Sequence, residues 1–220
     1  MSSIVRLWDR FLESRVTKSV LPYTLVSSER VRNLYRLSRQ IEKERIPGDV
    51  IECGVCNGGT AAVLARAASR SSMERTVWLF DSFQGMPEVS VEDSPGPGGD
   101  AADAHVGKEV GDVKRVQRVL SKVGADMKRV RIVSGWFQDT FPKVAIKKIA
   151  ILNIDADWYE SVKLCLETFY ERVVDGGFIS FDDYGHWPGC RKAVDEFFET
   201  RRLPYKLQKV DYTARWFRKE

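Results

Sequence analysis

Two short hydrophobic runs in the C-terminal half of the chain each stop abruptly on acidic residues. The first, KIAILNIDAD at residues 148–157, is nearly continuous and includes β-branched residues, and the second, GGFISFDDY at residues 176–184, follows a Gly-Gly break. Continuous rather than alternating hydrophobicity is typical of a strand buried in a parallel sheet. Between the two runs, apolar residues recur at roughly helical spacing from Tyr159 to Val174. The pattern predicts a strand–helix–strand unit whose two strands run in the same direction.

Three carboxylates follow these strands: Asp155 after the first run, and Asp182 and Asp183 after the second. Because parallel strands end at the same edge of a sheet, we expect the three acids to converge where open α/β sheets bind ligands. Like charges at such short range repel each other, and a divalent cation is the simplest compensation. Oxygen ligands with few nearby histidines favour a hard ion, Mg²⁺ first and Ca²⁺ or Mn²⁺ after it.

A second strand-and-loop pattern lies nearer the N-terminus. The strand DVIEC at residues 49–53 runs into the glycine-rich loop Gly54–Thr60, and an alanine-rich helix is expected from Ala61 to Ser69. Glycines let the backbone approach a ligand, and the free amides of a helix N-terminus favour a nucleotide-like cofactor. The spacing G-x-x-x-G-G differs from the dinucleotide pattern G-x-G-x-x-G, so a pyrophosphate is not specifically indicated. A tight turn whose glycines serve packing alone is the alternative.

The ends of two further predicted strands carry candidate cofactor contacts. The strand Thr76–Phe80 ends on Asp81, which can accept hydrogen bonds from ribose hydroxyls or merely cap the following turn. The strand Arg129–Ser134 is followed by Gly135 and Trp136. An aromatic ring at this place can flank an adenine or anchor the core.

The segment from Gly85 to Gly111 is rich in glycine, proline and acids, with little to bury. It is too long for a simple connection, and beside a cofactor site it indicates a mobile lid over residues 85–111. His105 lies in this lid, where a solvated side chain is the usual case and catalysis the alternative. Cys53 and Cys56 form a C-x-x-C pair, but the flanking glycines favour a ligand loop over redox chemistry.

The rest of the pattern completes an α/β domain. A helical cap is expected over residues 1–47, with a short helix at Ile4–Phe11 followed by a loop, and a longer helix capped by Ser27. Arg30 is one of several basic residues on the face of that longer helix which we expect to be solvated. Two final strands joined by a turn at Asp211 would form an antiparallel edge on an otherwise parallel sheet. The remaining expected elements are helices at Glu29–Lys43, Val113–Val123 and Gly189–Thr200 and strands at Tyr205–Val210 and Ala214–Arg218.

Composition and charge fit one domain of an ordinary globular protein. The chain has 220 residues, of which 43% are hydrophobic and 30% charged, and its formal net charge is +4. So mild a charge does not indicate nucleic acid, and no run approaches the ~20 apolar residues of a membrane span. We therefore expect neither a nucleic acid nor a membrane as a partner. The four cysteines lack the density of a disulfide scaffold and the N-terminus lacks a signal-peptide pattern, so a reducing cytoplasm is the expected location.

Four stretches together resemble the macrocin O-methyltransferase family: VIECGVCNGGTA, LFDSFQGMPE, ILNIDADWYES and GGFISFDDYGHWPGCRKAVDEF. The resemblance extends from Tyr23 to Phe198, and its most specific part is the Asp-Asp-Tyr motif with its spacing back to Asp155. It implies a Rossmann-like class I methyltransferase fold over residues 1–220, with a mostly parallel seven-stranded sheet, an antiparallel edge strand and helices on both faces. It also implies a homodimer that uses S-adenosylmethionine and Mg²⁺ to methylate a hydroxyl, on a sugar of a secondary metabolite or glycoconjugate.

The resemblance assigns roles to individual residues as well. Asp155, Asp182 and Asp183 would be the metal ligands, with Asp155 as the family's candidate base. Trp158 stands where catechol-methylating relatives carry a lysine base, which makes a phenolic acceptor the alternative and not the first choice. The cofactor-binding residues that the resemblance implies are Glu52, Gly54, Gly58 and Thr60 at the methionine end, Asp81 at the ribose, Trp136 near the adenine, and Ser82, Gly135 and Asp155.

Other hypotheses differ in the residues that they need. His186, three residues beyond Asp183, is a second candidate for the base because an unperturbed imidazole titrates near neutral pH, and a structural histidine is the alternative. A cofactor-binding regulatory module without catalysis would keep the glycine loop but would not need all three acids. A nucleotide hydrolase is disfavoured, since Gly54–Thr60 contains no lysine to bind phosphate.

Overall fold

A seven-stranded sheet forms the centre of the computed structural model, which describes residues 3–94 and 101–220. The strands follow the order β3-β2-β1-β4-β5-β7-β6, and those from β1 to β5 run parallel. β7 is antiparallel to both β5 and β6, so the predicted antiparallel edge is confirmed. The strands are β1 Asp49–Cys53, β2 Val77–Asp81, β3 Val130–Ser134, β4 Ile149–Ile154, β5 Val173–Phe181, β6 Gln208–Lys209 and β7 Arg215–Arg218. The helices are α1 Ser3–Val20, α2 Ser28–Lys43, α3 Gly59–Ser69, α4 Val113–Lys122, α5 Phe137–Thr140, α6 Tyr159–Phe169 and α7 Pro188–Arg201.

The strand order reverses between β1 and β4, which are neighbours in the middle of the sheet. Cys53 at the end of β1 pairs with Ile154 at the end of β4, and Ile154 pairs in turn with Phe181 at the end of β5. One residue further on, the amide of Asp155 donates to the carbonyl of Cys53 at 2.8 Å. The amide of Asp182 donates to the carbonyl of Ile154 at 2.9 Å. The register therefore brings both acids to the edge where open α/β sheets bind ligands.

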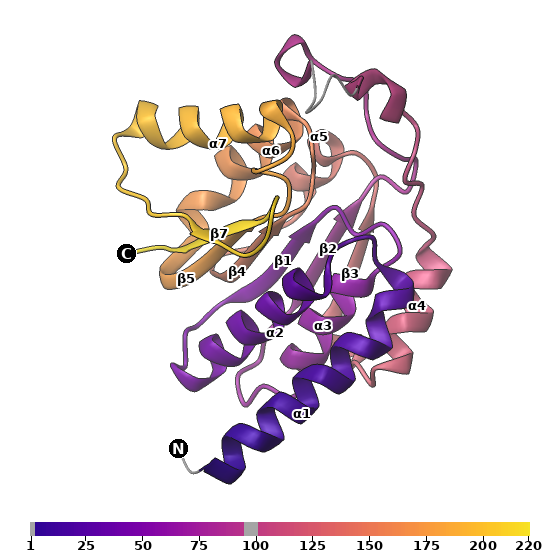
Figure 1. Ribbon diagram of the computed structural model, residues 1–220, viewed down its shortest axis with the longest axis vertical. Helices are drawn as coiled ribbons and strands as arrows, with labels where there is room; N and C mark the ends of the chain where they lie inside the picture. Colours follow the sequence, from indigo (N-terminus) through magenta and orange to yellow (C-terminus); the bar gives the residue numbers. More distant parts are fainter. Residues whose placement is uncertain (1–2, 95–100) are drawn as a thin grey trace.

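Helices cover both faces of the sheet, as predicted (Figure 1). On one face α1 to α4 enclose a hydrophobic core that includes Val20 and Leu64. On the other face α5 to α7 enclose a second core that includes Phe141, Phe169 and Phe198. All six residues of β4 are buried between these cores, which explains why its sequence shows no alternation. Measured against the length and hydropathy that a bilayer crossing needs, none of the described helices qualifies.

The first helix is longer than the sequence predicted. α1 continues to Val20 instead of ending near Phe11, so the prediction of a loop after Phe11 was wrong. Val16 and Val20 are buried in the core beneath α2 and α3, and tertiary packing of this kind stabilises a helix beyond its local pattern. Pro22 lies in the short 3₁₀ helix that follows, where its missing amide ends the α-helical ladder.

The Gly-Gly break lies inside a strand and not before it. β5 begins at Val173, although the sequence predicted a helix that reaches Val174. The pairing of β5 with β4 shifts register between Ile149 and Ile151, so several residues of β5 bulge out of the ladder. Gly176 belongs to this bulge. Its φ of 80° is a backbone conformation that a residue with a side chain would adopt only under strain.

The edge strand before the final turn is shorter than predicted. β6 covers only Gln208–Lys209, whereas the prediction began at Tyr205. The ring of Tyr205 stacks on Phe198 of α7 with 4.2 Å between ring centroids. This side chain therefore packs on the core of α6 and α7 before the strand begins.

The two ends of the predicted lid are paired with each other and one of them is tied to α6; residues 95–100 between them lie outside the described residues. The amide of Met86 donates to the carbonyl of Lys108, and the carbonyl of Met86 accepts from Gly107, both at 2.9 Å. The side chain of Asp93 is fully buried and accepts hydrogen bonds from the amides of Ser90 and Tyr159 at 2.8 and 2.7 Å. These contacts fix the two ends of the segment, and its mobility stays a prediction.

Candidate active site

A cavity of about 1060 Å³ opens at the carboxyl ends of the parallel strands. Its size and position are typical of small-molecule sites in α/β proteins. The predicted site residues on its wall are Gly54, Thr60, Asp81, Ser82, Trp136, Asp155, Asp182 and Asp183. Four predicted site residues are not among the described residues that form this wall: Glu52, Gly58, Gly135 and His186.

Close packing against the chain itself requires glycine at two positions of the glycine loop. Gly54 follows β1 with a φ of 88°, and a Cβ on it would lie 1.7 Å from the carbonyl oxygen of Asp155. Gly58 caps α3 with a φ of 85°, so the amides of the first turn of α3 are aligned with the loop. The alternative that these glycines serve packing is thus present, while the N-terminus of α3, with Thr60 on the cavity wall, suits a nucleoside-type cofactor. The residues present therefore fit the predicted S-adenosylmethionine.

Asp81 holds the glycine loop and the next turn together. Its Oδ2 accepts hydrogen bonds from the amides of Val55 and Cys56 at 2.7 and 2.8 Å, and its Oδ1 accepts one from Phe83 at 2.6 Å. The alternative that Asp81 caps the following turn is thus present in the structure. Both acceptor sites of Oδ2 are thus occupied while Oδ1 keeps one more than this network uses, and the ribose contact stays a prediction.

Glu52 is buried beside the loop rather than on the cavity wall. Its Oε1 accepts a hydrogen bond from the side-chain amide of Asn153 at 2.9 Å. Burial raises the pKa of Glu52 to about 8. Because Glu52 does not line the cavity, its predicted contact with the methionine end of the cofactor stays a prediction.

Asp155, Asp157 and Asp183 form a carboxylate cluster on the cavity wall. One carboxylate oxygen of each lies within 4.8 Å of the others. Burial, followed by the charges of Asp182 and Asp183, raises the pKa of Asp155 well above its usual range. Burial and the charge of Asp157 do the same to Asp183. Hard oxygen donors that repel one another at this distance fit a divalent cation.

Asp157 is the member of this cluster that the sequence prediction missed. Its backbone lies in the left-handed region with a φ of 53°. Residues other than glycine adopt this conformation at a cost of about 1–3 kcal/mol, and such residues cluster at functional sites. Burial, followed by the charge of Asp182, raises the pKa of Asp157 to about 7. The D-x-D spacing after β4 was the signal in the sequence.

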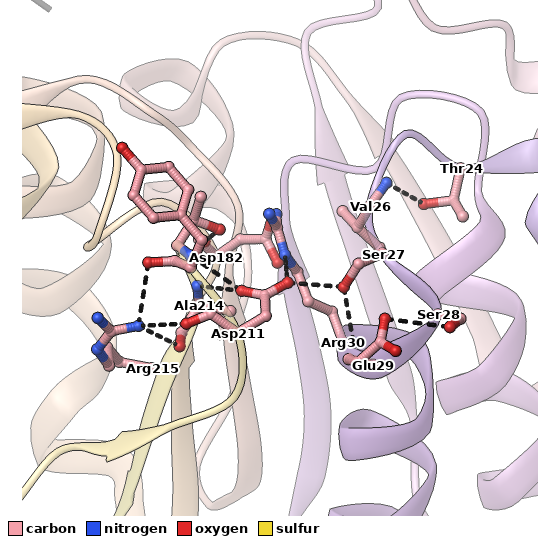
Figure 2. Close-up of polar contacts among 12 residues, drawn as sticks. Thr24, Val26, Ser27, Ser28, Glu29, Arg30, Asp182, Asp211, Ala214 and Arg215 are labelled. Atoms are coloured by element: carbon pink, nitrogen blue, oxygen red, sulfur yellow. Dashed lines mark hydrogen bonds and ion pairs between the residues drawn. The ribbon is translucent and has the colours of Figure 1, made fainter. Parts of the chain in front are cut away.

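Asp182, the third predicted metal ligand, is paired with Arg30 of α2 (Figure 2). Nη1 of Arg30 donates to Oδ2 of Asp182, and only 16% of the Arg30 side chain is exposed, so its expected place on a solvated face was wrong. Burial raises the pKa of Asp182 to about 6, although Arg30 lowers it. Asp182 lines the same cavity as the carboxylate cluster, and its role as a metal ligand stays a prediction.

The rings of both histidines lie against Trp187. The ring of His186 meets Trp187 edge-on at 4.6 Å between centroids and Tyr212 at 5.9 Å. The ring of His105 meets Trp187 at 5.3 Å, and His105 lies on the cavity wall. The lid thus returns His105 to the site, which no local pattern in the sequence indicates.

Trp136 and Phe137 divide the two predicted roles of an aromatic residue after β3. Phe137 stacks on Phe141 with centroids 4.9 Å apart and joins the core. Trp136 lies on the cavity wall. Trp136 therefore does not anchor the core, and its contact with an adenine stays a prediction.

Strand order, glycine loop and acids at the strand ends together define a Rossmann-like α/β fold, and comparison with solved structures places it among the methyltransferases. A solved structure agrees: that of the O-methyltransferase NovP has a TM-score of 0.78 and 30% sequence identity, and the alignment covers 90% of this chain and 82% of that one. The predicted fold class is confirmed.

Sequence comparisons narrow the class to one family. The sequence model described as macrocin-O-methyltransferase (TylF) matches residues 13–219. Mycinamicin III 3''-O-methyltransferase of Micromonospora griseorubida is 32% identical over 213 residues, which cover 94% of this chain and 82% of that protein. Demethyldecarbamoylnovobiocin O-methyltransferase of Streptomyces niveus is 34% identical over 177 residues, which cover 80% and 67%. The chain belongs to the macrocin O-methyltransferase family and is an S-adenosylmethionine-dependent O-methyltransferase, as the sequence predicted.

Proposed function

We propose that the protein methylates a sugar hydroxyl of a glycosylated secondary metabolite and requires a divalent cation, Mg²⁺ first, to do so. The observation that carries this proposal is the position of the carboxylate cluster in the same cavity as the glycine loop. The names of the two relatives, one acting on mycinamicin III and the other on demethyldecarbamoylnovobiocin, support an acceptor among secondary metabolites.

The residues of the cavity divide into those that would hold the cofactor and those that would hold the ion. When bound, S-adenosylmethionine would supply the methyl group and the divalent ion would lower the pKa of the acceptor hydroxyl. Gly54 and the first turn of α3 would hold the cofactor, with Trp136 against its adenine. The carboxylate cluster would hold the ion, together with Asp182 as the sequence predicts. The cavity walls would exclude water and align the acceptor oxygen with the methyl group, since in-line geometry contributes much of the rate.

The proton of the acceptor hydroxyl needs a base on the cavity wall. Asp155 and His186 are the candidates that the sequence offers, and the structure adds Asp157. Both carboxylates line the cavity, whereas His186 is turned against Trp187 and Tyr212. A base must come within hydrogen-bond reach of the proton that it accepts. We therefore place the proton acceptor on Asp155 or Asp157 ahead of His186.

Methyl transfer to a glycoside should be abolished by EDTA and restored by Mg²⁺. The purified protein is incubated with S-adenosylmethionine and a panel of glycosides, the matching aglycones and simple catechols, and formation of S-adenosylhomocysteine is measured. The proposal expects turnover with glycosides and loss of at least ~10²-fold without the ion. Turnover that EDTA leaves unchanged would contradict the metal requirement, and turnover restricted to catechols would favour a phenolic acceptor. Cofactor binding with no turnover on any acceptor would favour a regulatory module.

Mg²⁺ should stabilise the protein more at pH 8 than at pH 5. The folded-state pKa values of Asp157 and Asp182, about 7 and about 6, lie above the unfolded value of about 4. Between pH 4 and pH 7 the folded state therefore binds more protons than the unfolded state, and its free energy of unfolding falls as the pH rises. At pH 8 the ionised carboxylates repel and a divalent ion relieves them, whereas at pH 5 protons compete with the ion.

The measurement is the thermal unfolding midpoint in EDTA and in excess Mg²⁺ at both pH values. In EDTA the midpoint should fall between pH 5 and pH 8, and the gain from Mg²⁺ should be larger at pH 8. An equal concentration of charge supplied as NaCl is the control for general screening. A gain that is the same at both pH values, or that NaCl reproduces, would show that the carboxylate cluster does not bind the ion.

A homodimer and a cytoplasmic location complete the proposal. The dimer follows from the resemblance to the family, and the location from the four free cysteines, Cys53, Cys56, Cys165 and Cys190. Both stay predictions.

A further inference from the structure

Arg30 lies in the first turn of α2, between two carboxylates that come from distant parts of the chain (Figure 2). Its Nε donates to Oδ2 of Asp211 at 2.8 Å, and its Nη1 donates to Oδ2 of Asp182. The exposed fractions of the three side chains are 16% for Arg30, 17% for Asp211 and 9% for Asp182. Ion pairs this well shielded from water depend on both partners, because removal of one leaves an uncompensated buried charge.

Asp211 is itself fixed by hydrogen bonds on both of its oxygens. The hydroxyl of Ser27, the N-cap of α2, donates to Oδ2 at 2.6 Å, and the amides of Thr213 and Ala214 donate to Oδ1 at 3.0 and 2.9 Å. The hydroxyl of Thr213 donates to the carbonyl of Asp182 at 2.7 Å. A closed polar loop therefore joins the start of α2, the turn between β6 and β7, and the end of β5.

The segment that leads into α2 forms part of the cavity wall. Its residues on that wall are Tyr23, Thr24, Leu25 and Val26. A Cβ on Gly59, the first residue of α3, would lie 2.5 Å from Cβ of Thr24, so this segment lies directly against the N-terminus of α3. That end of α3 is where the glycine loop would hold the cofactor.

We infer that Arg30 is a positioning residue for the proposed methyl transfer, which couples the carboxylate end of the cavity to its cofactor end. Through its ion pairs it fixes Asp182 beside the carboxylate cluster, and through α2 it holds residues 23–26 against the glycine loop. Without the guanidinium, Asp182 and Asp211 face each other with no cation between them. Their repulsion displaces the end of β5 and the start of α2 together. The inference rests on the proposed function and deepens it.

Arg30→Met should raise the Kd for S-adenosylhomocysteine about tenfold and lower kcat at saturating cofactor about tenfold, the range typical for partners of ligand carboxylates. Calorimetry gives the first value and the methyl-transfer assay the second. Arg30→Lys keeps the charge but cannot bond both carboxylates through a fork, so its values should lie between those of Arg30→Met and wild type. Arg32→Met is the matched control on the same helix: its pair with Glu29 spans 3.9 Å, its side chain is 42% exposed, and both constants should stay unchanged.

A Kd or a kcat of folded Arg30→Met within about twofold of wild type would overturn the inference, because both ends of the cavity must respond. If Arg30→Met does not fold, Asp211→Asn removes one anchor and keeps the pair with Asp182. This variant should raise the Kd about threefold or more, the loss of one charged hydrogen bond, and an unchanged Kd overturns the inference as well. A wild-type protein that binds no S-adenosylhomocysteine would instead contradict the proposed function. Normal wild-type binding with unaffected variants removes the inference alone.

Discussion

Asp155→Asn should lower kcat/KM for methyl transfer by on the order of 10²–10³-fold and leave the protein at least as stable as wild type. The activity falls because asparagine offers one neutral oxygen in place of a carboxylate at the centre of the cluster. The stability holds because the raised pKa of Asp155 reflects burial and repulsion from Asp182 and Asp183. A neutral side chain of the same shape removes that repulsion, so in EDTA at pH 8 the unfolding midpoint should rise.

Steady-state kinetics with saturating cofactor and a thermal unfolding scan test both parts on one preparation. Asp175→Asn is the matched control, because Asp175 is exposed at the opposite end of β5 from Asp182. It should change neither value. A variant of Asp155 that loses activity and stability together would point to a structural carboxylate and not to a site for a cation. Retention of more than about a third of wild-type activity would exclude Asp155 from both of its predicted roles.

The sheet could be predicted from the sequence because its signals are local. A buried parallel strand must be apolar on both faces, so β4 stands out as a continuous run, and the helix after it fixes the direction of β5. The errors lie where packing overrides the local pattern. α1 extends to Val20 because Val16 and Val20 are buried, and β5 absorbs Gly176 as a bulge that the sequence presents as a break.

The site could be predicted only as far as topology determines it. Asp155 and Asp183 meet because they follow strands that end at the same edge. Arg30 escaped prediction because its partners Asp182 and Asp211 lie 152 and 181 residues away in sequence, and a basic residue on a helix is usually solvated. Its burial follows from the turn between β6 and β7, which folds over the start of α2. His105 reaches the cavity through the lid, whose path no hydrophobic periodicity determines.

Arg75→Met should lower the free energy of unfolding by about 3–5 kcal/mol, the largest effect on stability that we expect from one substitution. The Arg75 side chain is fully buried before β2. Its Nε donates to Glu42 at 2.6 Å, and its two terminal nitrogens donate to the carbonyls of Gly48 at 2.6 Å and Ile46 at 2.5 Å. One guanidinium thus donates hydrogen bonds to acceptors at the end of α2 and in the segment that enters β1. Methionine fills a similar volume but leaves the carboxylate and the carbonyls without donors, each at a cost of about 1–3 kcal/mol.

For a chain of this length the predicted loss corresponds to a fall of roughly 10 °C in the unfolding midpoint. Arg70→Met is the matched control, since Arg70 is exposed at the C-terminus of α3 and lies five residues away. Arg75→Lys should be nearly as harmful as Arg75→Met, because a single ammonium group cannot reach acceptors that surround a planar fork. The Kd for S-adenosylhomocysteine, measured well below the midpoint, should stay unchanged, because Arg75 does not line the cavity. A loss below about 1 kcal/mol would mean that water replaces the guanidinium at these acceptors, and hence that this corner of the fold opens to solvent.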